Sequence, residues 1–138
     1  MKVEGEKAII LPRNQKIERL SMSIKHFNQI PATPIPTGEG VSRKMLIRPD
    51  EGPNFAMRAF KIEAGGSMPM HTNDVEHQQY VLGGRAKVVI GGETHEVSKG
   101  DVVFIPALVP HNYEPIGDEP FEFICVVPNL PDETKLVK

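Results

Sequence analysis

Residues 70–84 read MHTNDVEHQQYVLGG and place two histidines, His71 and His77, in a segment that also has strand character. If the stretch is extended, side chains alternate between two faces, so His71, Asn73 and His77 share one face. On an α-helix, His71 and His77 would lie about 120° apart and would not reach one ion. A metal interpretation therefore requires a strand or a strand-like loop.

Chain length, charge and cysteine content limit the class of protein. The chain has 138 residues, a net charge of −2 and one cysteine, Cys125. This length suits one domain with its own core, and no basic stripe suggests nucleic-acid binding. A lone cysteine excludes an internal disulfide and a thiolate zinc cage. The apolar run near the N-terminus is too short for a signal peptide or a membrane span, so we expect a cytoplasmic protein.

The distribution of glycine and proline favours an all-β fold. The 12 glycines and 13 prolines fall between short β-branched runs, and no helical period is sustained after residue 40. Gly91-Gly92 suits a tight hairpin turn. We expect an antiparallel sandwich or barrel with strands at 41–47, 55–63, 78–82, 85–90, 93–98, 101–105 and 121–127.

Three parts of the chain differ in composition. Residues 1–40 form an N-terminal arm with a proline-rich linker, residues 41–130 the β-domain and residues 131–138 a C-terminal tail. Within the arm, residues 16–30 make either one short helix or an extended segment. The arm either packs on a second subunit, which would give a homodimer, or is a disordered tail.

A third histidine, His111, follows a predicted strand in GDVVFIPALVPHNYEP (100–115). Pairing of its strand beside His77 would complete a face of three imidazoles, which suits a divalent transition metal. Taken singly, each histidine is more often a structural or surface residue. The metal interpretation depends on their joint spacing.

Two motifs resemble those of the cupins. The first motif of that family is G-x5-H-x-H-x3,4-E-x6-G, and the second is G-x5-P-x-G-x2-H-x3-N. The first is matched here by Gly65-x5-His71-x-Asn73-x3-His77-x6-Gly84. The second is matched by Gly100-x5-Pro106-x-Leu108-x2-His111-x3-Pro115. The resemblance implies a double-stranded β-helix, the cupin or jelly-roll barrel.

Departures from the motifs change the expected set of metal ligands. His77 replaces the usual glutamate, as in the small single-domain cupins of the cupin 2 type that bind manganese with four histidines. Asn73 replaces the second histidine, and an amide oxygen is a weaker ligand than imidazole for these metals. Three outcomes stay open: three histidines with Asn73 as a weak fourth ligand, three histidines with an open position, or no metal. Leu108 and Pro115 replace the glycine and the asparagine of the second motif without removing a ligand.

The alternation of side chains along the predicted strands indicates which residues line the pocket around the histidines. Residues 121–127 read FEFICVV and place Phe123, Cys125 and Val127 on one face, which the resemblance directs toward the metal. Tyr113 shares the face of His111, and Met68 precedes His71 near the mouth. Cys125 is more often a small buried hydrophobe than a reactive group.

Two further polar residues have open roles. Gln79 continues the face of His77 and would hydrogen-bond a bound oxygen or orient a ligand imidazole. Arg58 either supplies a buried cation for an acidic substrate or pairs with a carboxylate at the surface or at a dimer seam.

These observations predict an enzyme that uses a divalent metal (Mn, Fe, Ni or Zn) and acts on a small organic molecule. Oxygen insertion by a dioxygenase-type oxidoreductase is the leading expectation. The alternatives are a Lewis-acid isomerase or decarboxylase, and a non-catalytic small-molecule binder with a weakened or absent metal site. The chain shows no glycine-rich phosphate loop and no serine nucleophile turn.

Overall fold

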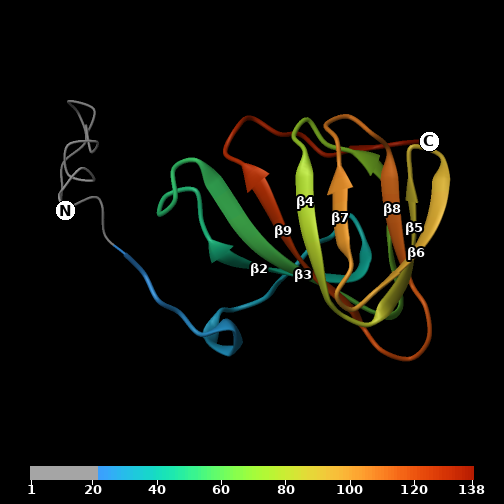
Figure 1. Cartoon of the computed structure of the whole chain (residues 1–138), viewed down its shortest axis with the longest axis horizontal. Helices are drawn as coiled ribbons and strands as arrows, with labels where there is room; N and C mark the ends of the chain where they lie inside the picture. The colour runs from blue at the N-terminus through green and yellow to red at the C-terminus, as the bar shows by residue number, and fades with distance from the viewer. Residues whose placement is uncertain (1–21) are drawn as a thin grey trace, which may run out of the picture.

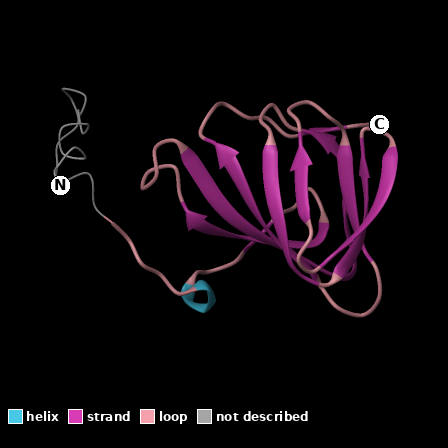
Figure 2. Cartoon of the chain, viewed as in Figure 1, coloured by secondary structure: helices cyan, strands magenta, loops and turns pink. Residues whose placement is uncertain are grey.

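The computed structural model describes residues 22–138, which fold into a curled antiparallel barrel (Figure 1). A single 3-10 turn, η2 (Phe27–Gln29), precedes the barrel, and the rest of the described chain is strand and loop (Figure 2). No helix in residues 22–138 has the length and apolar character needed to cross a membrane. The strands are β1 (Thr33–Pro34), β2 (Glu39–Ile47), β3 (Phe55–Thr72), β4 (His77–Gly83), β5 (Arg85–Ile90), β6 (Glu93–Ser98), β7 (Val102–Ile105), β8 (His111–Pro115), β9 (Phe121–Pro128) and β10 (Lys135–Leu136).

The strands form two halves that share β3. The first part of β3, residues 55–62, pairs with β2 and β9, and the sheet continues through β4 to β7. The last part pairs with β8 and β10, and this half continues through β5 to β6. The predicted antiparallel β-fold is confirmed, and one long strand connects the two halves.

Strand β3 runs nine residues beyond the predicted end at 63, to Thr72. Gly65 has a φ of 84°, and a Cβ on Gly66 would lie 2.3 Å from the carbonyl oxygen of Glu39. These glycines let the chain turn from one half to the other while it stays close to β2. The bend places His71 in the second half.

The partner strands of β8 differ from the expected pairing. His111 lies opposite His71 on β3 and Ile90 on β5, not beside His77 on β4. The pairing with the His77 strand, which the sequence left open as a condition for the three-imidazole face, is therefore not formed. His77 pairs with Ile105 instead, and its ring approaches that of His111 across the barrel interior.

The described part of the arm is extended rather than helical up to η2, and residues 16–21 lie outside the described part of the chain. Its β1 adds to the edge of β2, and Lys44 Nζ donates a hydrogen bond to the carbonyl oxygen of Phe27. The core lies between the halves and includes packed rings of Tyr113, Phe121 and Phe123.

Candidate metal and substrate site

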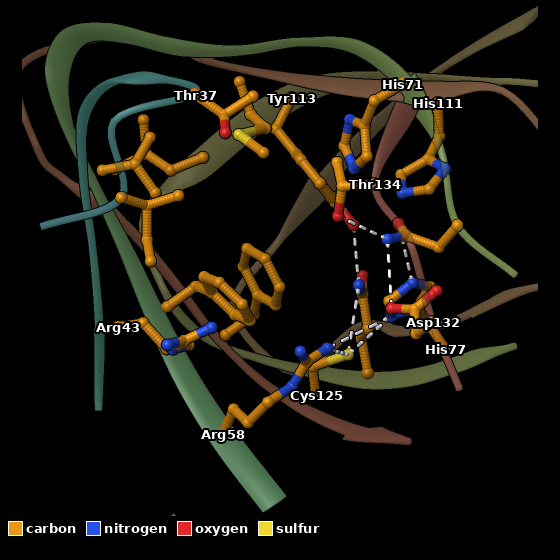
Figure 3. Close-up of a pocket in the computed structure, with 18 residues that line it drawn as sticks. Thr37, Arg43, Arg58, His71, His77, His111, Tyr113, Cys125, Asp132 and Thr134 are labelled. Atoms are coloured by element: carbon orange, nitrogen blue, oxygen red, sulfur yellow. Dashed lines mark hydrogen bonds between the residues drawn. The ribbon is translucent and has the colours of Figure 1, made fainter. Parts of the chain in front are cut away.

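A cavity of about 300 Å³ lies between the two halves of the barrel. Figure 3 shows His71 and His111 on one side of it and Arg43 on the other, while Arg58 reaches toward Cys125 and His77. Ten of the residues singled out from the sequence line it: Arg58, Met68, His71, Asn73, His77, Gln79, His111, Tyr113, Phe123 and Cys125. Val127 does not, because it faces the core further along β9, opposite Ala56.

The three imidazoles form one cluster. The ring centroids of His71 and His111 are 4.2 Å apart, and those of His77 and His111 are 5.5 Å apart. All three side chains are buried. They come from the end of β3, the start of β4 and the start of β8, which meet at the same end of the barrel.

Backbone carbonyls fix the tautomers of two of these rings. His71 Nδ1 lies 2.8 Å from the carbonyl oxygen of Pro69, and His111 Nδ1 lies 2.9 Å from that of Val109. Because a carbonyl oxygen only accepts, each Nδ1 carries the proton and donates it. Each Nε2 therefore keeps a free lone pair, as in imidazoles that ligate metals.

The C-terminal tail fixes the orientation of Asn73. Asn73 Nδ2 donates to Thr134 Oγ1 at 2.9 Å and to Asp132 Oδ2 at 3.3 Å. The amide oxygen consequently faces the imidazoles, and His77 Nε2 donates to it at 3.1 Å. The residue that replaces the usual histidine thus presents an oxygen to the cluster.

His77 is held in a different way from the other two histidines. Its Nδ1 lies 3.1 Å from Cys125 Sγ and 3.4 Å from Arg58 Nη2, while its Nε2 is bound to Asn73. With Nε2 engaged, His77 has no free lone pair for an ion at the cluster. Across residues 22–138, no three His, Cys, Asp or Glu side chains have the arrangement of a metal site as they stand.

Burial keeps the cluster neutral. It lowers the pKa of His77 to about 3, with smaller effects from Arg58 and the other two rings, and the pKa of His111 to about 4. Burial also lowers the pKa of His71. Neutral imidazole is the form that binds metal, so these rings need lose no proton at pH 7.

Gln79, Tyr113 and Cys125 form a second polar group beside the histidines. Gln79 Nε2 donates to Tyr113 Oη at 2.6 Å and to Cys125 Sγ at 3.7 Å, and it makes no hydrogen bond with an imidazole in the described chain. Burial raises the pKa of Tyr113 and the pKa of the Cys125 thiol. At neutral pH both stay protonated, so Tyr113 keeps a hydroxyl proton to donate.

Sequence reasoning missed Arg43, Asp132 and Thr134, which also line the cavity. Arg43 could have been predicted, because it lies two residues from both Val41 and Met45 and so shares their face of β2. No sequence signal predicts the other two. Their position depends on the pairing of β10 with β3 at His71 and Thr72.

Residues 58–127 match the family of cupin domains. The chain is a cupin. This cupin has 28% identity over 95 residues with the uncharacterized protein MJ1618 of Methanocaldococcus jannaschii, which is 67% of this chain and 76% of that protein.

Two other similar proteins have named activities. The 1-methylthio-D-xylulose 5-phosphate methylsulfurylase of Rhodospirillum rubrum is 28% identical over 102 residues, which is 70% of this cupin and 65% of that protein. The polyketide cyclase RemF of Streptomyces resistomycificus superposes with a TM-score of 0.77 at 28% identity, covering 86% of this chain and 87% of that chain. The proteins similar to this cupin therefore include enzymes.

Proposed function

We propose that this cupin is a metal-dependent enzyme that acts on a small organic molecule, with His71, His77 and His111 as ligands of a divalent transition metal. The observation that carries the proposal is the pair of carbonyl-bound Nδ1 atoms of His71 and His111. These contacts leave an unprotonated Nε2 on each of two rings that line the cavity and whose centroids lie 4.2 Å apart. A buried structural histidine also satisfies its ring N–H, so the support lies in two such rings 4.2 Å apart beside a cavity, an arrangement that metal-ligating histidines commonly show.

The donor set fits such an ion after one rearrangement at His77. Its proton moves from Nε2 to Nδ1, where Cys125 Sγ is in place to accept the hydrogen bond. Loss of the contact with Asn73 frees both His77 Nε2 and the amide oxygen. That oxygen then serves either as a weak fourth ligand or as a neighbour of an open position.

A bound Mn, Fe, Ni or Zn ion would polarise a substrate oxygen, and a redox-active one would also support oxygen insertion. The residues of the chain have separate tasks. Tyr113, oriented by Gln79, donates a hydrogen bond to a substrate oxygen. With the proton of His77 on Nδ1, Cys125 Sγ accepts the hydrogen bond from Nδ1–H, and the aromatic rings around the cavity exclude water.

A second candidate is non-redox chemistry at a carbonyl group, such as isomerisation or decarboxylation. The similarity to a polyketide cyclase over 86% of the chain supports it, because that name describes no oxidation. Oxygen consumption by the iron-loaded protein, measured against a panel of small organic substrates, distinguishes the two. Dioxygenase chemistry requires uptake of oxygen, and Lewis-acid chemistry does not.

The metal site itself is tested by titrating the metal-free protein with Co²⁺ and recording the visible absorption of the bound ion. We expect one Co²⁺ per chain in the wild type, and loss of the spectrum in His111→Ala. His95→Ala is the matched control, because His95 is an exposed histidine on β6. Absence of Co²⁺ binding in the wild type would contradict the proposal and leave a non-catalytic small-molecule binder.

We also propose that two copies associate through the N-terminal arm and that the protein works in the cytoplasm. In support of the first, Met22 and Ile24 on the arm are 95% and 100% exposed, although both are apolar. In support of the second, Cys125 is a free buried thiol, which suits a reducing compartment.

A further inference from the structure

Two arginines project into the cavity from neighbouring strands. Arg43 on β2 lies opposite Phe60 on β3, and Arg58 on β3 lies opposite Met45 on β2. The two residues are therefore diagonal neighbours on the same face of the sheet. Both line the cavity, and Figure 3 shows their guanidinium groups directed into it, on the side away from His71 and His111.

Neither guanidinium has a carboxylate partner in residues 22–138. Within this described part of the chain, no ion pair within 4.0 Å involves either arginine, and the Nε atom of each is buried without a hydrogen-bond partner. Among residues 22–138, the hydrogen-bond partners of the terminal nitrogen of Arg58 are the neutral groups Cys125 Sγ and His77 Nδ1. Both side chains are half-buried, and two adjacent, partly desolvated cations without a counter-charge are unfavourable unless an anion joins them.

One acid, Asp132, also lines the cavity, but its contacts lie elsewhere. Its Oδ1 accepts a hydrogen bond from the backbone of Asp74 at 2.7 Å, and its Oδ2 accepts one from Asn73. Asp132 thus binds the turn after β3 and makes no close pair with either arginine. The charge of the arginine pair remains uncompensated within the described chain.

The chemistry of the pair indicates what would bind there. A guanidinium presents several donors in one plane, which matches the two oxygens of a carboxylate or the oxygens of a phosphate. Next to the pair, the rings of Phe60 and Phe123 stack with centroids 5.3 Å apart, and Arg58 lies over the Phe60 ring at 5.1 Å. An anionic group attached to a flat apolar body suits this combination.

We propose that Arg43 and Arg58 form a subsite for the carboxylate or phosphate group of a small organic substrate. If the proposed function holds, the substrate reaches from this subsite toward the histidine cluster. This orientation of the substrate rests on the proposed function. Binding of the anion itself does not require a metal. The two proposals are therefore separable by experiment.

Calorimetry with three matched probes tests the subsite: benzoate, phenyl phosphate and the neutral benzyl alcohol. Titrations use the full chain as purified and again after chelator treatment. We expect one of the anions to bind at least about 10-fold more tightly than benzyl alcohol, with or without metal. The preferred anion then identifies a carboxylate or a phosphate as the substrate group.

Variants assign the binding to the arginines. Arg43→Gln should weaken anion binding about 10-fold or more, and Arg43→Lys, which keeps the charge, should retain part of it. Arg48→Gln removes the same charge from an exposed arginine paired with Asp50 and should have no effect. Equal affinity for benzoate, phenyl phosphate and benzyl alcohol, or an unchanged affinity in folded Arg43→Gln, would overturn the subsite. Anion binding that persists without metal, in a protein that binds no Co²⁺, would overturn only the metal proposal.

Discussion

Asn73 is the residue at which this cupin departs most from its family motif, and its surroundings explain how the change is tolerated. The tail residues Asp132 and Thr134 hold its amide nitrogen, so its oxygen faces the cluster. A histidine at this position would supply a fourth imidazole, a stronger ligand for these metals than an amide. We predict that Asn73→His lowers the dissociation constant for Co²⁺ by about 10-fold or more. A weaker site in this variant would show that residue 73 does not face the ion.

The neutral histidines predict how the stability of the metal-free protein depends on pH. The folded-state pKa values of His77 and His111, about 3 and about 4, lie below the ordinary value of 6.5. Between pH 6.5 and 5, the unfolded chain therefore binds more protons than the folded one. The free energy of unfolding should fall as the pH drops, by at most about 1.4 kcal/mol per pH unit for each histidine.

Urea denaturation at pH 7, 6 and 5 measures this dependence. The His77→Gln/His111→Gln double variant should show a shallower decline, whereas His95→Gln should match the wild type. A wild-type free energy that stays constant from pH 7 to 5 would mean that these rings are not held neutral by burial.

At the scale of the elements, Gly84 is the motif glycine whose role is clearest. It lies between β4 and β5 with a φ of 76°, and a Cβ there would lie 2.1 Å from the carbonyl oxygen of Pro120. Gly84→Ala should therefore lower the free energy of unfolding by about 3 kcal/mol or more, since backbone strain and overpacking combine. Gly83→Ala is the control, because a Cβ at Gly83 meets no atom within 4 Å. Equal thermal denaturation midpoints for the two variants would refute the assignment.

Leu108 shows that a motif position can keep its backbone conformation after losing its glycine. It is the one residue other than glycine with a positive φ in the described chain, at 69°, and its N–H donates to the carbonyl oxygen of Asn73 at 2.8 Å. The left-handed conformation persists because this hydrogen bond holds the loop against the turn that carries Asn73.

Local signals predicted most of the strands, and distant partners determined the rest. The limits of β5 and β6 agree with prediction because Gly91 and Gly92 both adopt positive φ in the turn between them. The extension of β3 to Thr72 depends on β8, a strand far along the chain. Within the site, alternation located the faces of His71, His77 and Cys125, whereas the contacts of Asn73 required the docked tail.

For the whole molecule, the main prediction concerns the arm. Met22 and Ile24 on the arm are exposed in the single chain, and β1 lies along the edge of β2. If these surfaces pair two copies, deletion of residues 1–38 should shift the protein from dimer to monomer. Analytical ultracentrifugation of both forms measures the change. An unchanged subunit count after deletion would remove the arm from the interface.

The most direct test of the account is elemental analysis of the protein purified without chelator or affinity tag, together with His71→Ala. We predict about one manganese, iron, nickel or zinc per chain in the wild type and loss of that metal in the folded variant. The element found would also indicate redox or Lewis-acid chemistry. Metal-free wild-type protein, or equal metal content in both proteins, would contradict the assignment of the three histidines as a metal site.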